Sequence, residues 1–315
     1  MSAGPSLDDI RVAARRIAPF IHRTPVLTCA SLDALAGARL YFKCENLQKT
    51  GSFKIRGATN AILQLSAAEA ARGVVTQSSG NHAAAVARAS AARGIAAHIV
   101  MPKNAPAVKC RAVEGYGGVI TFCEPTIEAR DAAAKRLLEE TGAVLVHPYN
   151  NRRVIAGQGT AALELLEDVP ELDVLLVPVS GGGLLSGNAI AATSIRPSVR
   201  VIGCEPANAD DAYRSLKAGH IEKNTSVDTI ADGLRAQLCD LTFSILRERV
   251  DEVVRVTEQA IVDSMRLIWE RMKLVVEPSA AVALAPAVTR SIKADGKRVG
   301  VLLSGGNVEL SALPF

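Results

Sequence analysis

Short apolar runs alternate with alanine-rich amphipathic stretches along most of the 315-residue chain. This alternation is typical of strands joined to parallel neighbours by helices. The number of repeats suggests two sheets rather than one. The sequence therefore predicts an α/β fold with two parallel-type sheets and flanking helices. Strands are expected over residues 39–43, 73–76, 97–101, 118–122, 173–177, 199–203 and 298–303, and helices over residues 83–94, 127–141, 157–168 and 258–273.

Two boundaries in this pattern divide the chain. A change near residue 73 and a return near residue 150 would make the middle segment a smaller domain inserted into a larger one. We therefore expect residues 1–72 and 151–315 to form the larger domain, and residues 73–150 to form the smaller one.

The composition narrows the class of protein. Hydrophobic residues make up 49% of the chain and charged residues 22%, which excludes a disordered polypeptide. The net charge of +4 is spread without a basic stripe, so we expect no nucleic-acid partner. No bilayer-spanning run or signal peptide is visible, so we expect no membrane association. The six cysteines form no CxxC pair, which argues against disulfides or a zinc site and favours a cytoplasmic protein.

A lysine with apolar neighbours is the strongest candidate for a reactive residue. Lys54 stands between Phe53 and Ile55 in a glycine-flanked stretch. Burial among apolar residues lowers the pKa of a lysine, and a neutral amine can form a Schiff base with an aldehyde. The alternative is a surface lysine at the start of a helix, with Ser52 as the N-cap. The local pattern alone favours that alternative.

One expected strand runs into a glycine-rich turn, at the strand end where open α/β sheets bind ligands. The backbone N–H groups of Gly181, Gly182 and Gly183 could surround a phosphate at the start of the next helix. Tight packing is the alternative explanation for these glycines. A dinucleotide-binding fingerprint is a weaker one, because Gly181, Gly183 and Gly187 follow a GxGxxxG spacing rather than GxGxxG.

Two further strands end in polar turns. Residues 78–82 read Ser-Ser-Gly-Asn-His, which suits either a helix cap or a nest for a carboxylate. Ser304 follows the last expected strand and would face the same crevice. An ordinary turn residue is the alternative for Ser304.

An acidic segment after the strand at 199–203 is a candidate cation site. Oxygen ligands from Glu205 and Asp211, with a backbone carbonyl between them, suit a hard cation such as Mg²⁺ or Ca²⁺. The alternative is an acidic loop that caps a helix, and the pattern alone favours it.

The order of these motifs is more specific than any single one. From residues 22–26 (His-Arg-Thr-Pro-Val) to residues 303–307 (Leu-Ser-Gly-Gly-Asn), the chain resembles the fold-type II pyridoxal-phosphate enzymes. Within them it is similar to the serine racemase and serine/threonine dehydratase family, also at residues 123–125, 154–160, 209–211 and 269–274. The resemblance implies a tryptophan synthase β-like fold, with a larger cofactor domain, a smaller mobile domain that closes over the substrate, and a homodimer.

The resemblance also implies roles for individual residues. Lys54 would form the Schiff base with pyridoxal 5′-phosphate, and Ser79 would exchange a proton on the opposite face of the cofactor ring. The cofactor contacts besides Lys54 would come from Phe53, Asn81, Gly181, Gly182, Gly183, Leu184, Gly233 and Ser304. The substrate carboxylate would lie against Ser78, Asn81 and His82. A divalent cation (Mg²⁺ or Ca²⁺, with Mn²⁺ as a further candidate) would bind Glu205, the Ala209 carbonyl and Asp211.

The implied activity is α,β-elimination, a dehydration and deamination of a β-hydroxy amino acid to a 2-oxo acid and ammonia. L-Serine, L-threonine or a 3-hydroxy analogue would be the substrate, with serine racemisation as a second outcome. A serine racemase proper, or a dehydratase specialised for 3-hydroxyaspartate or phenylserine, is the alternative within the family. Alternatives of other kinds are an NAD-dependent oxidoreductase, a cysteine synthase-like enzyme and a non-catalytic binding protein.

Two departures from the family pattern bear on substrate and regulation. Residues 150–153 (Asn-Asn-Arg-Arg) replace a segment that is usually acidic or proline-bearing, and Arg152 and Arg153 could favour an acidic substrate side chain. An ordinary solvated loop is the simpler interpretation. Ala84 stands where eukaryotic serine racemases carry a glutamine near their nucleotide site, which argues against activation by ATP.

Overall fold

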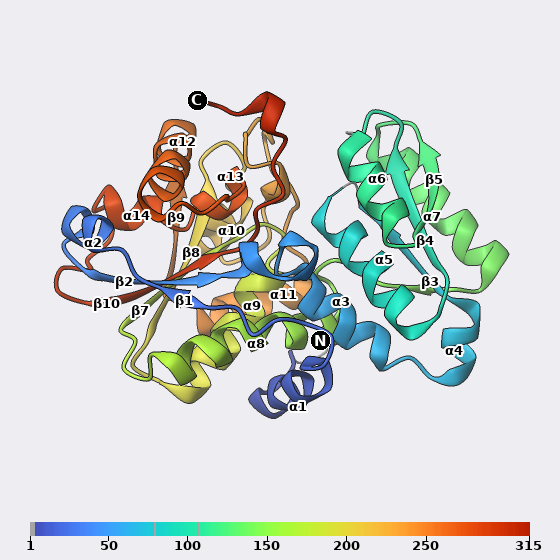
Figure 1. The fold of residues 1–315 in the computed structure, drawn as a ribbon, viewed down its shortest axis with the longest axis horizontal. Coiled ribbons are helices and arrows are strands. Elements are labelled where there is room, and N and C mark those ends of the chain that lie inside the picture. Colours follow the sequence, from blue (N-terminus) through green and yellow to red (C-terminus); the bar gives the residue numbers. More distant parts are fainter. Residues whose placement is uncertain (1–3, 79, 106) are drawn as a thin grey trace.

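Two separate β-sheets organise the chain (Figure 1). The computed structural model describes residues 4–78, 80–105 and 107–315. Every neighbouring pair of described strands is parallel except β1 with β2, so the predicted α/β fold is confirmed apart from one antiparallel edge strand. The larger sheet consists, in order across it, of β1 (Val26–Leu27), β2 (Arg39–Cys44), β10 (Arg298–Leu303), β7 (Val174–Pro178), β8 (Arg200–Pro206) and β9 (Glu252–Val256). The smaller sheet consists of β5 (Val119–Cys123), β4 (Ala97–Pro102), β3 (Val74–Gln77) and β6 (Val144–Leu145).

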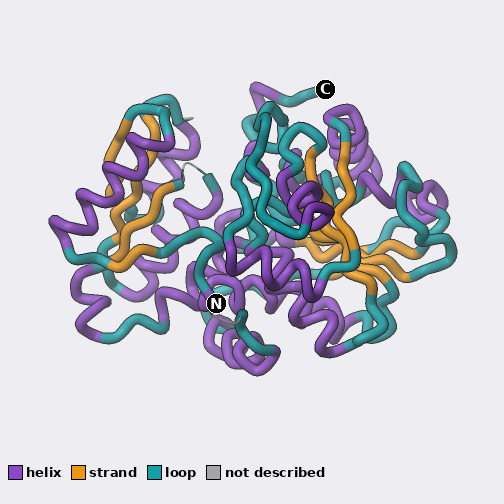
Figure 2. Tube along the Cα trace, turned by 180° about the vertical axis from the view of Figure 1, so that it is seen from behind, coloured by secondary structure: helices purple, strands orange, loops and turns teal. Residues whose placement is uncertain are grey.

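Helices connect the strands and cover both faces of each sheet, as the view from behind also shows (Figure 2). Among the described residues, no helix combines the length and the apolar character needed to cross a bilayer. The α-helices are α1 (Leu7–Ile17), α2 (Ala30–Ala36), α3 (Lys54–Leu63), α4 (Ala67–Arg72), α5 (Asn81–Arg93), α6 (Ala107–Gly115), α7 (Ile127–Thr141), α8 (Arg152–Asp168), α9 (Gly183–Ile195), α10 (Asp211–Ala218), α11 (Asp240–Arg249), α12 (Glu258–Leu267), α13 (Pro278–Ala281) and α14 (Ala285–Val288). The shorter turns are η1 (Glu45–Leu47), η2 (Lys49–Gly51), η3 (Asp232–Leu234) and η5 (Leu310–Ala312), with η4 (Ile268–Met272) as a π-helix.

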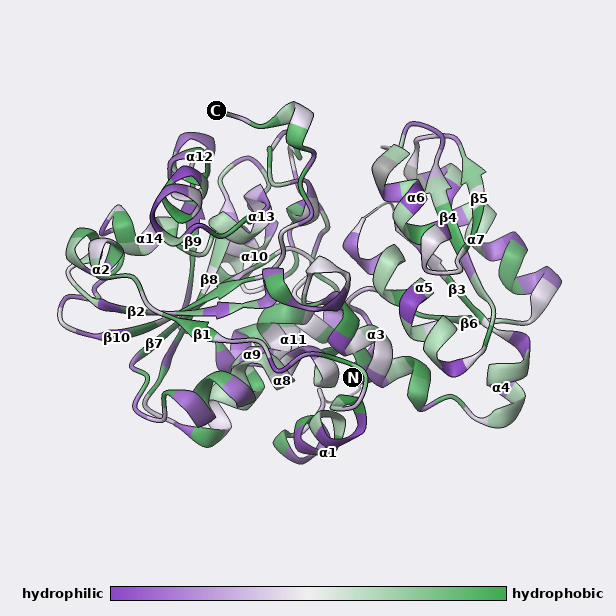
Figure 3. Ribbon diagram, viewed as in Figure 1, coloured by the Kyte–Doolittle hydropathy of each residue, from purple (hydrophilic) through white to green (hydrophobic). Residues whose placement is uncertain are grey.

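Side chains of the larger sheet alternate between two cores. On β7, Val174 and Leu176 pack into the core that contains α12 and α13, whereas Leu175 and Val177 pack into the core that contains α8 and α9. Because successive side chains on a strand point to opposite faces, a central strand covered on both sides must be apolar throughout. The central strands are accordingly hydrophobic along most of their length (Figure 3).

Helix α3, which begins at Lys54, lies between the layers of the two sheets. Its Ile55 and Ile62 belong to the core beneath β3 and β4. On another side, Gly57 packs against α8, where an added Cβ would lie 2.5 Å from Gln158 Nε2. The missing side chain lets the two helices come close, and Lys54 is thereby placed at the junction of the two sheets.

The predicted elements differ from the observed ones mainly at their ends. All seven predicted strands are present. The helix predicted from residue 157 begins at Arg152, because the Asn151 side chain accepts hydrogen bonds from the N–H groups of Arg153 and Val154 and caps it. The helix predicted over 258–273 ends as an α-helix at Leu267 and continues as η4. Strand β9 was not predicted, since Glu252 and Arg255 interrupt its apolar pattern.

Candidate active site

The amine of Lys54 is held in a partly buried position at the start of α3. Its Nζ lies 5.0 Å from the centre of the Phe53 ring. Burial lowers the pKa of Lys54 to about 8, and the negative charge of Glu277 partly opposes that shift. Phe53 occupies the cap position of α3, and the buried Ser52 hydroxyl has no hydrogen-bond partner among the described residues. The alternative of a surface lysine behind a serine cap is therefore wrong.

The segment before Lys54 pairs with the segment after β10. Ser52 and Gly305 form an isolated antiparallel bridge. The backbone N–H of Phe53 donates to the carbonyl oxygen of Ser304 at 3.0 Å. Ser304 is itself buried. Backbone contacts thus bring Lys54 and Ser304 together from opposite ends of the chain.

The glycine loop at residues 181–183 leads into the first turn of α9. Gly182 has a φ of +84°, in the left-handed region that favours glycine. An added Cβ at Gly181 would lie 2.5 Å from the Tyr149 ring, and one at Gly182 would lie 2.8 Å from the Cβ of Thr242. The close packing of Tyr149 and Thr242 therefore leaves no room for a side chain at Gly181 or Gly182. The backbone N–H groups and the positive end of α9 remain as the features that can bind an anion.

His147 and Tyr149 connect this loop to Lys54. Their rings meet edge-on with centroids 4.5 Å apart. Burial, with a smaller contribution from the charge of Lys54, lowers the pKa of His147 to about 4. The sequence reasoning did not single out either residue. They follow β6 in a connecting segment that has no motif of its own.

Asn81 is fixed by two residues that the sequence reasoning missed. Its Nδ2 donates to both carboxylate oxygens of Glu277, at 2.8 and 3.1 Å. Its Oδ1 accepts a hydrogen bond from Asn307 Nδ2 at 2.8 Å. Glu277 is only 4% exposed, and burial raises its pKa to about 7 although the hydrogen bond from Asn81 opposes the shift. An acid inside the apolar run at 274–282 is the signal that could have identified Glu277, because buried carboxylates need partners.

The imidazole of His82 forms a hydrogen bond with the backbone. Its Nε2 lies 2.9 Å from the Val146 carbonyl oxygen and therefore carries the proton. Burial lowers the pKa of His82 to about 3, with a smaller contribution from the charge of Lys54. The neutral ring then has no N–H left for a substrate carboxylate. In the first turn of α5 the N–H groups of Ala83 and Ala84 donate to the Gly80 carbonyl oxygen, so those of Asn81 and His82 are the ones that can serve an anion instead.

Three further predicted site residues are Ser78, Ser79 and Gly233. The Ser78 hydroxyl accepts a hydrogen bond from the Gly80 N–H at 3.3 Å. Gly233 is exposed in η3, where its N–H donates to Ser279 Oγ at 3.0 Å. Ser79, predicted as the second proton-transfer residue, lies outside the described residues.

The predicted cation ligands surround the start of α10. Glu205 accepts hydrogen bonds from the N–H groups of Ala212 and Tyr213 at 2.9 and 2.8 Å. Asp211 accepts from Leu238 N–H and from Asn224 Nδ2, each at 2.9 Å. Among the described residues, no three His, Cys, Asp and Glu side chains converge to hold a metal ion. A cation here would therefore need ligands besides these side chains, such as a backbone carbonyl or water.

Burial raises the pKa of both carboxyl groups. The pKa of Asp211 rises to about 6. That of Glu205 rises well above its ordinary value, mainly through burial and also through the negative charge of Asp211. The two groups are therefore close enough to repel each other when both are ionised.

A cleft of about 430 Å³ opens beside Asn81. Asn81 and Ala84 of α5 and Lys109 of α6 line one side, and Asp232 and Asn307 line the other. An ion pair crosses it, from Lys109 Nζ to Asp232 Oδ2 at 2.6 Å. The cleft therefore lies between helices of the smaller sheet and loops of the larger one.

Arg152 and Arg153 do not line this cleft. Both are exposed in the first turn of α8. The charge of Arg152 acts on the pKa of Asp9 in α1, and that of Arg153 acts on Glu69 in α4. The idea that this pair selects an acidic substrate is therefore not supported by its position.

Comparison with known proteins gives a consistent family. Residues 17–305 match the family model described as "Pyridoxal-phosphate dependent enzyme". Serine racemase of Oryza sativa subsp. indica is 53% identical over 312 residues, covering 98% of this chain and 92% of that protein. The beta-hydroxyaspartate dehydratase of Paracoccus denitrificans (strain Pd 1222) is 48% identical over 311 residues, covering 99% of each. The solved structure of maize serine racemase has a TM-score of 0.96 and 52% identity, covering 98% of this chain and 95% of that chain.

The family match spans Lys54, the glycine loop and Ser304, and it favours this family over the dinucleotide-binding alternative. The relatives match nearly the whole chain, so the resemblance is not confined to one motif. The chain therefore belongs to the pyridoxal-phosphate dependent enzyme family.

Proposed function

We propose that this enzyme dehydrates and deaminates a β-hydroxy amino acid to a 2-oxo acid and ammonia. The substrate class is L-serine, L-threonine and their 3-hydroxy analogues. The observation that carries the proposal is the partly buried Lys54 amine, whose pKa burial lowers to about 8. Near neutral pH such an amine is partly unprotonated, so it can attack an aldehyde carbon and can also accept a proton.

The described residues around Lys54 fit pyridoxal 5′-phosphate. The Lys54 amine would hold the cofactor, and the backbone N–H groups of residues 181–184 at the start of α9 would hold its phosphate. Phe53 would lie beside the ring, Asn81 at its 3′-oxygen, and Ser304 at the pyridine nitrogen, with Gly233 lining the ring. When bound, the cofactor supplies an electron sink for the charge left at Cα after proton removal.

Proton transfer at Cα is the task that we assign to the protein. Lys54 takes the Cα proton on one face. Ser304 offers the ring nitrogen a neutral hydroxyl rather than a carboxylate, which favours rapid loss of a β-hydroxyl group over slower reactions. We assign Ser79 to the opposite face, where returning the proton would give the D-enantiomer. Racemisation and elimination would then compete after one shared step.

We place the substrate carboxylate at the N-terminus of α5. The N–H groups of Asn81 and His82 and the helix dipole favour a negative charge there. Ser78 precedes this turn, and Asn81 and His82 begin it. His82 would contribute its backbone N–H, because its ring donates to Val146.

A second candidate is a dehydratase for 3-hydroxyaspartate. The observation that favours it is the 48% identity, over 99% of both chains, to the Paracoccus beta-hydroxyaspartate dehydratase. Serine racemase activity is favoured in the same way by the rice protein. The three activities share the proton removal at Cα and differ in the group at Cβ and in the fate of the product.

We further propose that residues 73–150 form a smaller domain that closes over the substrate, while residues 1–72 and 151–315 form the cofactor domain. The two separate sheets support this division. The ion pair between Lys109 and Asp232 crosses from one part to the other and would hold the closed arrangement. Closure would exclude water from the site during the reaction.

A divalent cation at Glu205, the Ala209 carbonyl and Asp211 is part of the proposal, with Mg²⁺ or Ca²⁺ as the first candidates and Mn²⁺ as a further one. Two buried carboxyl groups with raised pKa values support it. A bound cation would offset their repulsion and keep both ionised.

We also propose a homodimer in the cytoplasm. The six cysteines, all within the described residues, are free thiols, in keeping with a reducing compartment. Size-exclusion chromatography with light scattering tests the dimer directly.

A substrate panel tests the proposed activity. The purified holoenzyme is incubated with serine, threonine, 3-hydroxyaspartate and phenylserine, and both 2-oxo acid and D-enantiomer are measured. We expect 2-oxo acid from at least one of them. We also expect Lys54→Ala to lose the visible absorbance of bound cofactor together with activity. A Lys54→Ala variant that keeps both would overturn the assignment.

A further inference from the structure

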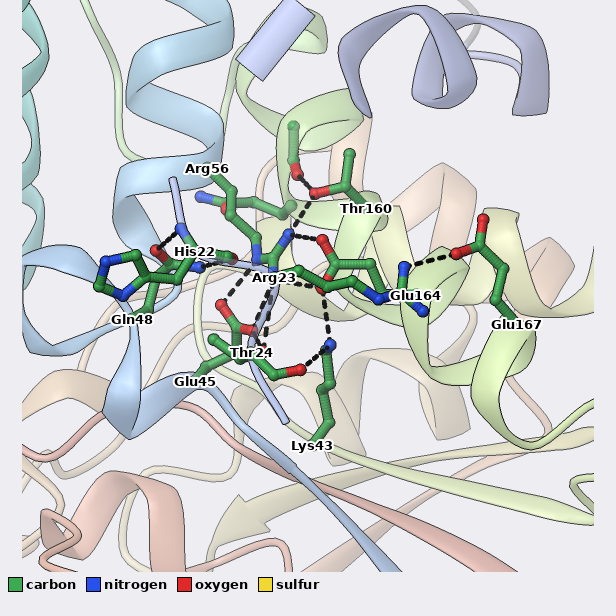
Figure 4. Close-up of polar contacts among 12 residues, drawn as sticks. His22, Arg23, Thr24, Lys43, Glu45, Gln48, Arg56, Thr160, Glu164 and Glu167 are labelled. Atoms are coloured by element: carbon green, nitrogen blue, oxygen red, sulfur yellow. Dashed lines mark hydrogen bonds and ion pairs between the residues drawn. The ribbon is translucent and has the colours of Figure 1, made fainter. Parts of the chain in front are cut away.

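A set of buried charged side chains meets around Arg56 of α3 (Figure 4). We call it the Arg56 cluster, and its ionised members are two cations and two anions. Arg56 lies two residues after Lys54 in α3, and its side chain is completely buried. The cluster consists of Arg56, Lys43, Glu45, Glu164, Thr24 and Thr160.

The guanidinium of Arg56 is fully used. Its Nε and Nη2 donate to the two oxygens of Glu45 at 2.7 and 2.8 Å. Its Nη1 and Nη2 donate to the two oxygens of Glu164, both at 2.8 Å. Nη1 also donates to Thr160 Oγ1 at 3.0 Å. Arginine has five N–H donors in a fixed planar fork, and a lysine could not reproduce this pattern.

The partners of Arg56 belong to other elements of the larger sheet's layers. Glu45 begins η1, directly after β2, and Glu164 belongs to α8. Lys43 of β2 completes the network, because its Nζ donates to Glu164 at 2.6 Å and to the Thr24 carbonyl oxygen at 2.7 Å. The first turn of α3 is thereby tied to a strand and to a neighbouring helix.

Stability alone does not account for such a cluster. Burial would lower the pKa of Arg56, but the charges and hydrogen bonds of Glu45 and Glu164 raise it above its ordinary value, so the group stays ionised. Removing ions from water is costly, and well-packed apolar residues are often as stabilising as a buried ion pair. A buried, saturated fork does, however, fix one geometry.

The geometry that it fixes is the rotation of α3. Residues that are two positions apart in an α-helix are separated by about 200° around the axis. Lys54 and Arg56 therefore project to nearly opposite sides. Close packing holds the same turn from α8, where an added Cβ at Gly157 would lie 2.6 Å from the Arg56 carbonyl oxygen. A first turn anchored on one side cannot rotate, and the side chain on the other side keeps its direction.

We propose that Arg56 is a positioning residue that aims the Lys54 amine by locking the first turn of α3 to Glu45 and Glu164. The proposal rests on the role of Lys54 in the proposed function. A misplacement of about 1 Å can cost on the order of a hundredfold in rate. We therefore expect loss of the fork to lower kcat much more than it raises KM.

Two variants test this role, with one matched control. Arg56→Lys keeps the charge and removes the fork. The double variant Arg56→Met with Glu45→Gln removes one cation and one anion, so no uncompensated charge stays buried and folding is preserved. The control is Arg23→Gln, since Arg23 also pairs with two carboxylates, Glu167 and Asp168, but is half exposed and lies outside α3.

We measure kcat, KM, thermal stability and the pH dependence of the bound cofactor's visible absorbance. The pH midpoint for chemical labelling of Lys54 is measured separately in the cofactor-free full chain. We expect both Arg56 variants to lower kcat by about ten- to a hundredfold. A released Lys54 should also be labelled with a midpoint above the value of about 8 that burial gives it. The control should match the wild type in each measurement.

The outcomes separate the positioning role from the proposed function. If the double variant regains wild-type thermal stability together with wild-type kcat and labelling midpoint, Arg56 is only structural and the proposal is wrong. The same holds if Arg56→Lys behaves as the wild type in every measurement. If the wild type itself shows neither the cofactor absorbance nor elimination, the proposed function fails, and the labelling midpoint still decides whether Arg56 positions Lys54.

Discussion

The carboxylate of Glu277 accepts two hydrogen bonds from the single amide nitrogen of Asn81, at 2.8 and 3.1 Å. Glu277 thereby joins the turn before α13 to the first turn of α5. Burial raises the pKa of Glu277 to about 7. The carboxyl group in this link therefore changes between its neutral and charged forms near neutral pH.

Replacing Glu277 should change how stability depends on pH. The folded pKa of about 7 lies above the ordinary value of 4.5, so the carboxyl group stabilises the fold fully below pH 4.5. That contribution is lost as the pH rises through 7. We expect Glu277→Gln to remove this loss, so that the difference in Tm between variant and wild type grows in favour of the variant from pH 4.5 to 8. The control is Glu139→Gln, which replaces an exposed carboxylate in α7. A constant difference across this range would contradict the shifted pKa.

Lys54 should give the opposite pH dependence of stability in the cofactor-free protein. Its folded pKa of about 8 lies below the ordinary value of 10.5, because of burial. The contribution of Lys54 to stability is therefore full above pH 10.5 and is lost as the pH falls through 8. We expect Lys54→Met to be more stable than the wild type at pH 7, by about 2–4 °C in Tm. The gain should vanish towards pH 10.5. Equal Tm values at pH 7 would show that the amine is not buried.

The glycine loop should couple to Tyr149. Gly181→Ala would place a Cβ 2.5 Å from the Tyr149 ring, and we expect a loss of about 1–3 kcal/mol in unfolding free energy, with weaker cofactor binding. In a Tyr149→Ala background the same change should cost much less. Denaturant unfolding of the four proteins measures this coupling. Gly115→Ala is the control, since no atom lies near its Cβ direction. Additive effects would show that the ring does not limit the loop.

Chelation should destabilise the protein if the cation site is real. Mg²⁺ or Ca²⁺ added to chelator-treated wild type should raise Tm, because it offsets the repulsion between Glu205 and Asp211. Asp211→Asn should abolish that gain. Asp228→Asn, an exposed acid nearby in sequence, should preserve it. If chelation alters neither Tm nor activity of the wild type, the site does not exist.

The order of the motifs along the chain predicted Lys54, because its local pattern alone favoured a surface lysine. The three glycines after β7 are recognisable because they follow an apolar strand and precede a helix. Glu277 and Asn307 are not, since their importance comes from meeting Asn81, which is distant in the chain. Arg56 was hidden for the same reason, because an arginine at a helix start is usually solvated.

The fold shows the same limit. Long apolar strands such as β10 were predicted at their full length, because burial on both faces leaves an unbroken signal. Strand β9 was missed, since Glu252 pairs with Arg200 at the sheet edge and the pattern is mixed there. Helix α8 starts earlier than predicted because its cap is a side chain, Asn151, whose effect depends on backbone geometry.

Dissolved salt will act on the two sets of charges around this site in different ways. It screens ions that water can reach, such as Lys109 and Asp232, whose side chains are 26% and 46% exposed. It leaves Arg56 and Glu45, both at 0%, almost untouched. Ionic strength should therefore loosen the contact across the cleft while the helix that carries Lys54 keeps its place. A salt titration of KM and kcat thus separates access to the site from the chemistry within it.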